Sequence, residues 1–156
     1  MSVLGLITMS DLNRREVRRV AYELLLDLET VLGELVMRRF KDSWDWVRHL
    51  SEPAQVRLLG QSELSRKRGI GTNLVESAML PELLVVVSRT EELRKAVGMP
   101  SGREMEGTVR KIGDFRNRVM HPVRPFVLDE RDVLRMLGAI EAALQLKEQL
   151  RTVVEA

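Results

Sequence analysis

Residues 115–122 read FRNRVMHP and bring together side chains that can act on a phosphate ester. The stretch contains His121, one of only two histidines in the chain, five residues after Arg116. Histidine can take up and release a proton near neutral pH, because the ordinary pKa of its imidazole is about 6.5. An arginine guanidinium can hold a phosphate through two parallel hydrogen bonds and stabilise charge that develops on it. Arg116 and His121 are therefore candidate catalytic residues.

Asn117 is the third catalytic candidate, because it lies only about 40° from His121 around a helix axis and is close enough to orient the imidazole. Arg116 lies roughly 140° from His121 on an ideal helix. The two can share one site only if the last helical turn frays or a second chain contributes. Four nearby basic residues are candidates for binding further phosphates of a substrate: Arg110, Lys111, Arg118 and Arg124.

Helical patterns occupy most of the chain and predict an all-α fold, a bundle of about five helices. Residues 12–40 form one long amphipathic pattern. Apolar side chains recur every three or four residues there, which predicts a buried stripe of Val17, Val20, Leu24, Leu28, Val31, Leu32 and Leu35. Ser51 and Pro53 are typical of the start of a second helix. The apolar third segment is either kinked or divided by Pro81.

The fourth predicted helix carries the candidate catalytic residues at its C-terminal end. Ser101 is its expected N-cap, and the helix should end near His121 because Pro122 disfavours helical geometry in the residue before it. Asp129 is the expected N-cap of the last helix. The apolar face predicted for that helix consists of Val133, Leu137, Ile140, Leu144 and Val154.

Composition narrows the possible classes of function. The 156 residues, 44% of them hydrophobic, suffice for one ordinary core. A formal charge of +2 gives no strong overall field, so a polyanion must be bound locally. Without cysteine the chain has no disulfide, thiolate metal site or thiol nucleophile, and His, Asp and Glu show no metal-ligand spacing, so we expect neither metal nor cofactor. With no leader pattern and no apolar run that could span a bilayer, we expect a cytoplasmic protein.

The first twelve residues differ from the rest. Residues 3–7 read as a short buried strand, followed by a turn into helix. Gly5, Thr8 and Asp11 resemble the closing strand and turn of a CBS domain, in whose adenosine-binding members such hydroxyl and carboxylate groups would hold the ribose. The alternative is a short lead-in in which Ser10 or Asp11 caps the first helix. We therefore divide the chain into a lead-in, residues 1–12, and a helical domain, residues 13–156.

The arrangement of Arg116, Asn117, His121 and Pro122 resembles the motif of HEPN domains, a family of small α-helical bundles. A long first helix, an apolar third segment and a closing helix after the histidine also have counterparts in that family. The resemblance implies a homodimer in which a two-fold axis brings the two copies of the motif together. It also implies a metal-independent endoribonuclease, since the RNA 2′-hydroxyl needs only a base to remove its proton and a cation to steady the phosphate.

Two classes of function remain open. The first is an endoribonuclease in a toxin, defence or stress system, whose candidate regulators are a nucleotide-sensing CBS module and an antitoxin partner. The second is a non-catalytic HEPN module for dimerisation or RNA binding. HEPN toxins that are modified on a tyrosine carry it two residues after the histidine, where this chain has Val123, so we do not expect that mode of control.

Structural roles are the alternatives for individual residues. His121 could be only a helix C-cap, and Arg116 could pair with Asp114 or Glu130 at the surface. The arginine-rich residues 14–19 and 66–68 are expected on solvated faces. Trp44 and Trp46 are expected in the core, beside His49 in the first interhelical turn.

Overall fold

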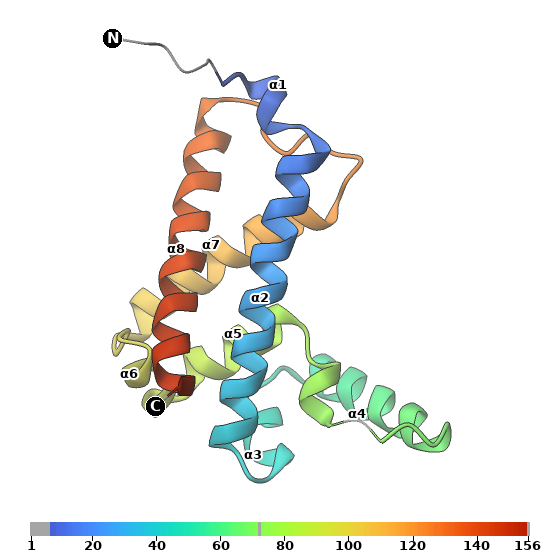
Figure 1. Cartoon of the computed structure of the whole chain (residues 1–156). Helices are drawn as coiled ribbons and strands as arrows, with labels where there is room; N and C mark the ends of the chain where they lie inside the picture. Colours follow the sequence, from blue (N-terminus) through green and yellow to red (C-terminus); the bar gives the residue numbers. More distant parts are fainter. Residues whose placement is uncertain (1–6, 72, 156) are drawn as a thin grey trace.

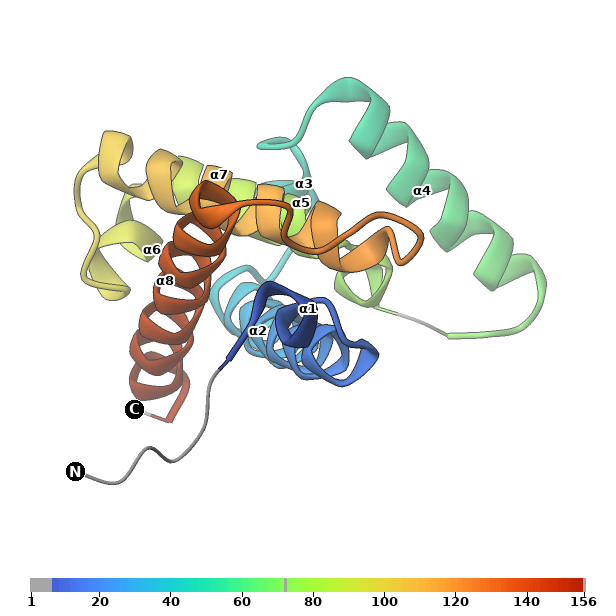
Figure 2. The ribbon, with the colours of Figure 1, turned by 90° about the horizontal axis from the view of Figure 1, so that it is seen from above.

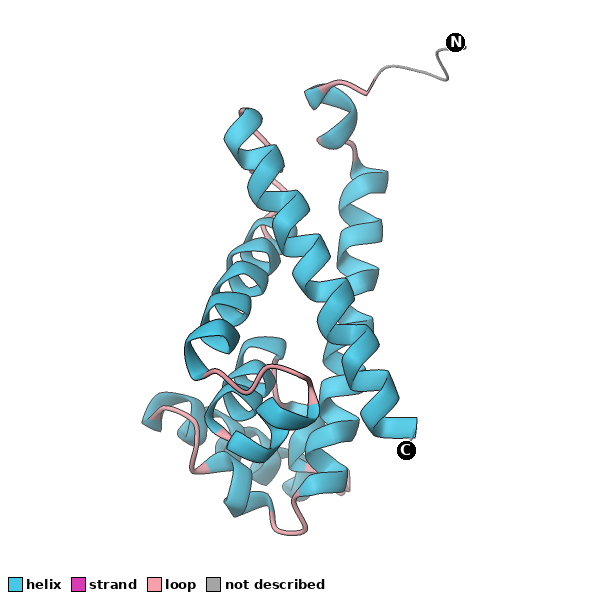
Figure 3. Cartoon of the chain, turned by 90° about the vertical axis from the view of Figure 1, so that its left-hand side faces the viewer, coloured by secondary structure: helices cyan, strands magenta, loops and turns pink. Residues whose placement is uncertain are grey.

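The computed structural model describes residues 7–71 and 73–155, and these residues form an all-α bundle. Every regular element in this part of the chain is a helix (Figure 3). Five helices have ten or more residues: α2 (Arg15–Arg39), α4 (Glu52–Lys67), α5 (Leu80–Arg89), α7 (Gly102–Met120) and α8 (Glu130–Glu155). Short elements connect them: α1 (Met9–Leu12), α3 (Ser43–Val47), η1 (Leu74–Ser77) and α6 (Glu91–Ala96). The predicted bundle of about five helices is confirmed.

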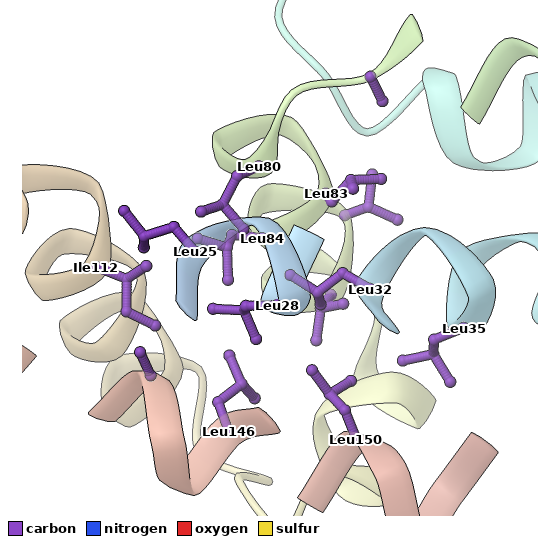
Figure 4. Close-up of a cluster of buried hydrophobic side chains, with 14 of the residues drawn as sticks. Leu25, Leu28, Leu32, Leu35, Leu80, Leu83, Leu84, Ile112, Leu146 and Leu150 are labelled. Carbon is purple, nitrogen blue, oxygen red and sulfur yellow. The ribbon is translucent and has the colours of Figure 1, made fainter. Parts of the chain in front are cut away.

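Helices α2 and α8 run side by side in the same direction, and α5 and α7 pack across them (Figures 1 and 2). Leucines of α2, α5 and α8 meet Ile112 of α7 in the centre of the core (Figure 4). Fully or almost fully buried side chains there include Leu28, Leu32, Leu84, Ile112 and Leu146. In contrast, α4 projects from the bundle and buries only Leu58 (Figure 1). The core that positions α7 is therefore built mainly from α2, α5 and α8.

Local sequence signals explain most of the helix boundaries. The hydroxyl of Ser101 accepts a hydrogen bond from the Glu104 amide, and the carboxylate of Asp129 accepts one from the Asp132 amide at 2.8 Å. Both predicted caps are confirmed. Pro81 lies in the first turn of α5 and so begins a separate helix. Gly69 and Gly98, at φ of 72° and 67°, allow the chain to turn after α4 and α6, since side chains rarely adopt this geometry.

The first helix does not begin at residue 12 as predicted. Residues Met9–Leu12 form the short helix α1, and the chain bends at Asn13 and Arg14 before α2. Thr8 caps α1, so Ser10 and Asp11 were the wrong candidates for the cap. The expected non-helical lead-in therefore ends earlier than residue 12. Most of the strand expected at residues 3–7 lies outside the described residues.

The buried faces of α2 and α8 agree only in part with those predicted: Leu28, Leu32, Leu35 and Val154 are buried as expected, but other members of the two faces differ. On α2 the core includes Ala21 and Leu25, whereas Val20 is 61% exposed. On α8 it includes Ala139 and Ala143, whereas Leu137 and Leu144 are each 49% exposed. Small alanine side chains permit closer packing at a helix contact than leucines do. The prediction for Trp44 is also wrong, since that side chain is 53% exposed while Trp46 is buried.

No helix in the described part of the chain has both the length and the apolar character needed to cross a membrane.

Candidate functional site

The residues 115–122 lie at the C-terminal end of α7, as predicted. His121 is the C-cap residue, with φ of −109° and ψ of 78°, so the chain leaves helical geometry directly before Pro122. The residues 121–129 then cross to the start of α8 beside α1 (Figure 1). His121 is exposed. Its backbone carbonyl accepts a hydrogen bond from the Arg124 amide, which closes a tight turn after the helix.

The structure places Arg116 beside Asn117 but does not join either side chain to the imidazole. Arg116 Nη1 lies 3.5 Å from Asn117 Oδ1, the outer limit of a hydrogen bond. Within residues 7–71 and 73–155, the His121 imidazole has no hydrogen bond and Arg116 has no carboxylate within ion-pair distance. The expected surface pair of Arg116 with Asp114 or Glu130 does not form. Arg116 is half-buried, and Asn117 is exposed.

Arg116 and Asn117 line two different hollows. Arg116 lies at a small hollow of about 160 Å³ between α2, α5 and α7. Asn117 lines a cleft of about 510 Å³ between α7 and α8, together with Lys111 and Arg118. Successive helical residues differ by about 100° in direction, so neighbours in sequence face different elements. Within one chain, the candidate catalytic residues thus do not converge on a single cavity.

Arg18, on α2, holds the end of α7 in place. Its guanidinium donates hydrogen bonds to the carbonyls of Arg118, Val119 and His121 and, at 2.7 Å, to the carbonyl of Arg124. The last carbonyls of a helix lack partners within the helix, so a side chain that binds them satisfies polar groups that would otherwise be left unpaired. Arg18 also lies over the Phe126 ring, 5.1 Å from its centroid. The expectation that arginines 14–19 are only solvated is wrong for Arg18.

Asn13, which lies just before α2, binds the loop that follows His121. Its amide oxygen accepts hydrogen bonds from the backbone amides of Phe126 and Val127, and its amide nitrogen donates to the Val127 carbonyl at 2.8 Å. Phe126 and Val127 are buried. The bend between α1 and α2 therefore anchors the loop that leads away from the candidate site.

Arg118 is bound to the protein itself. Its Nη2 atom lies 2.7 Å from Oδ1 of Asp132, the only polar or charged side chain among the fully buried described residues, at 6% exposure. Its Nη1 atom donates to the Phe126 carbonyl. The hydrogen bond from Arg118 lowers the pKa of Asp132 and, conversely, the carboxylate raises the pKa of Arg118. These contacts argue against the predicted role of Arg118 as a phosphate ligand.

The other three basic candidates are exposed. Lys111 lies at the rim of the cleft between α7 and α8, and Arg110 precedes it on α7. Arg124 lines an open hollow of about 710 Å³ beside the start of α2, together with Arg15 and Arg18. Among the residues that the structure describes, no acidic side chain lines that hollow. We call it the basic hollow.

The arginines around α2 and α7 fall into two groups, those that form an ion pair with a carboxylate and those that do not. Arg14 pairs with Asp11 and Arg19 with Glu23. Arg15, Arg116 and Arg124 have no carboxylate partner within the described residues. Unpaired guanidinium groups keep their hydrogen-bond donors available for an anion. Sequence reasoning missed Asn13 and Arg18, because their partners at the end of α7 and in the loop after it lie 100 or more residues away. It also missed Asp132, whose partner Arg118 lies on another helix.

Thr8 and Asp11, the residues of the CBS-like pattern, bind each other. The Asp11 carboxylate accepts hydrogen bonds from the Thr8 amide at 2.9 Å and hydroxyl at 2.7 Å, and the hydroxyl accepts from the Asp11 amide. The two residues form a capping box, so their side chains serve to begin helix α1. Gly5 lies outside the described residues.

The second histidine, His49, lies away from this region. It is partly buried, and its ring centroid is 6.5 Å from that of Phe40. Partial burial lowers its pKa, with smaller contributions from Arg48 and Arg89. Arg89 donates a hydrogen bond to its carbonyl, which supports the predicted role of His49 in holding the first interhelical turn. Among residues 7–71 and 73–155, no three potential ligand side chains gather as a metal site would require.

Comparisons of the chain with protein-family models, with curated proteins and with solved structures found no match.

Proposed function

We propose that this protein is a metal-independent endoribonuclease of the HEPN type, acting in a toxin, defence or stress system. The observation that carries the proposal is the surface around the end of α7. His121 is exposed there, and the arginines that precede and follow it in sequence, Arg116 and Arg124, have no carboxylate partner among the described residues. Of the described residues, those that line the basic hollow include no acidic side chain. Such a surface attracts a polyanion locally, although the chain as a whole is nearly neutral.

The proposed reaction uses the nucleophile that RNA carries. An imidazole nitrogen of His121 takes the proton of a 2′-hydroxyl, and the 2′-oxygen attacks the adjacent phosphorus. The bond from phosphorus to the 5′-oxygen breaks, and that oxygen leaves with a proton from the imidazolium or from water. Arg116 binds the phosphate and stabilises the charge that builds on it. Asn117 orients the catalytic groups, and the basic residues Arg110, Lys111 and Arg124 bind neighbouring phosphates.

The catalytic groups are proposed to meet in a homodimer. Arg116 lines a hollow on the α2 and α5 side of its helix, whereas His121 projects beyond the helix end. Two copies related by a two-fold axis could present Arg116 of one chain to His121 of the other. In such a dimer, the arginine and the histidine of one site come from different chains, so they need not meet from the same helix.

A second candidate function is a non-catalytic HEPN module that dimerises or binds RNA. The separation of Arg116, Asn117 and His121 within the single chain favours it, because in this arrangement their side chains do not form one site. In this case the conformation of His121 serves only to end α7. RNA could still bind across the basic hollow.

An RNA-cleavage assay on His121→Ala distinguishes the two functions. We expect this variant and Arg116→Ala to lose cleavage with little change in melting temperature, because neither side chain is fully buried or paired with a charge. Asn117→Ala should lose less activity. Arg19→Ala is a matched control, an exposed arginine that pairs only with Glu23. Full cleavage by His121→Ala would contradict the catalytic role of His121, whereas RNA binding without cleavage by the unmodified protein would support the non-catalytic module.

A further inference from the structure

The small hollow beside Arg116 differs from the other surfaces near the candidate site. Buried Leu25 and Leu80 form its floor, and four partly exposed apolar side chains surround its mouth: Tyr22, Leu26, Met79 and Met120. Tyr22 is 45% exposed and is the only tyrosine in the chain. The hollow therefore combines an apolar floor with one accessible aromatic ring.

Two polar groups complete the lining. One is the half-buried, unpaired guanidinium of Arg116, the proposed phosphate ligand. The other is Glu29, whose Oε2 atom accepts a hydrogen bond from the Leu80 amide at 2.7 Å. This bond fixes the carboxylate at the start of α5, and its second oxygen has no recorded partner among the described residues. The hollow thus offers a cation and a fixed hydrogen-bond acceptor above an apolar floor.

The apolar floor, the aromatic ring and the two polar groups of the hollow are suited to binding a single planar ring that carries polar substituents. The volume of about 160 Å³ is too small for a drug-sized ligand but comparable to a single nucleobase. Every nucleobase can stack on an aromatic ring, and thioether side chains such as Met79 and Met120 adapt to flat apolar surfaces. An exocyclic amino group on the base could donate to the free oxygen of Glu29.

We infer that this hollow is a nucleobase subsite, which receives the base of a nucleotide next to the phosphate held by Arg116. The inference rests on the proposed function, because it takes the substrate to be RNA. Tyr22 supplies the stacking surface and Glu29 the acceptor for an amino group. The subsite would therefore strengthen binding of A, C or G at this position more than binding of U.

Binding of a non-cleavable RNA tests the subsite without depending on catalysis. The probe is a fluorescent oligonucleotide fully 2′-O-methylated, and its Kd is measured by anisotropy. We expect Tyr22→Ala to raise Kd roughly 5- to 150-fold, the range for losing one base–aromatic stack. Tyr22→Phe keeps the ring and should stay within about threefold. Trp44→Ala removes another exposed aromatic ring, on α3, and should leave Kd unchanged.

A series of probes with one abasic position each locates the base. At the position whose base occupies the hollow, the abasic probe should bind the unmodified protein more weakly than the intact probe does. Tyr22→Ala should bind the abasic and intact probes with the same affinity. Replacing that base with U should weaken binding to the unmodified protein but not to Glu29→Gln. If Tyr22→Ala loses the same affinity for every abasic probe, or none at all, the subsite is overturned.

Two further outcomes separate this inference from its alternatives. Tyr22-dependent binding by a protein that cuts no RNA would support the subsite and reject the proposed ribonuclease. Loss of the dimer in Tyr22→Ala, detected by light scattering, would overturn the subsite, because a second copy of the chain would then be the occupant of the hollow.

Discussion

Asp132 places a buried charge near the candidate site. It is buried, pairs with Arg118 and also accepts a hydrogen bond from the Leu128 amide at 3.1 Å. The hydrogen bond from Arg118 lowers its pKa below the ordinary value of 3.8. An acid with a lowered pKa in the folded state contributes stability above its unfolded pKa, and loses that contribution as the pH falls through its folded pKa.

We therefore predict that Asp132→Asn lowers the free energy of unfolding by an amount that depends on pH. Near pH 7 the variant should unfold with a free energy about 1–3 kcal/mol lower, the usual size for a hydrogen bond to a charged group. The difference should shrink as the pH falls below 3.8, and the two proteins should converge only at a pH well below that value, where Asp132 is protonated in the folded protein as well. Urea unfolding at both pH values measures this. A difference that does not change with pH would show that packing, and not the charge, accounts for the loss.

The contacts of Arg118 also show that the role of a residue cannot always be predicted from its neighbours in sequence. Its position among basic neighbours predicted a phosphate ligand, and sequence alone gave no sign of Asp132 as its partner, 14 positions later and on another helix. Arg116 and Arg124 have the same residue type and a similar setting but no carboxylate partner in the described residues. Only the fold distinguishes a bound arginine from an available one.

At the scale of elements, α2 positions the end of α7 through Arg18. Four backbone carbonyls between residues 118 and 124 receive hydrogen bonds from this one guanidinium. His121 follows the last helical turn, so its position depends on how that turn is held. Arg18 is thus a positioning residue for the candidate site.

We predict that Arg18→Ala lowers the free energy of unfolding by about 1–3 kcal/mol, because four carbonyls, two of them part-buried, lose a charged hydrogen-bond donor. The melting temperature should fall by several degrees. RNA cleavage should fall as well, since the end of α7 loses its fixed geometry. Arg19→Ala on the next position is the control and should change stability by less than about 1 kcal/mol. Equal effects of the two variants would contradict the role of Arg18.

The elements themselves were largely predictable, and their contacts were not. Ser101, Asp129 and Pro81 act through neighbours in sequence, so their signals could be read directly. The buried faces of α2 and α8 were harder, because both helices carry apolar residues around more than one face. The faces with Ala21, Ala139 and Ala143 are buried because α2 and α8 pack against each other and against α7. The bend at Asn13 depends on a loop more than 100 residues away.

At the scale of the whole molecule, we predict a homodimer with the end of α7 near its two-fold axis. The single chain separates Arg116 from His121, and apolar side chains such as Met120 and Val123 are exposed around them. Light scattering coupled to size-exclusion chromatography at high micromolar concentration measures the mass directly. A strict monomer under these conditions would contradict a composite site.

The central claim concerns the chemistry of cleavage, and the ends of the RNA products test it most directly. The purified protein is incubated with RNA in EDTA, and the products are analysed by mass spectrometry, with His121→Ala as the control. Attack by the 2′-oxygen predicts a 2′,3′-cyclic phosphate and a 5′-hydroxyl, no cleavage of DNA, and protection of RNA by a single 2′-O-methyl group at the cut. Cleavage that requires added magnesium, or products with a 5′-phosphate and a 3′-hydroxyl, would contradict the account.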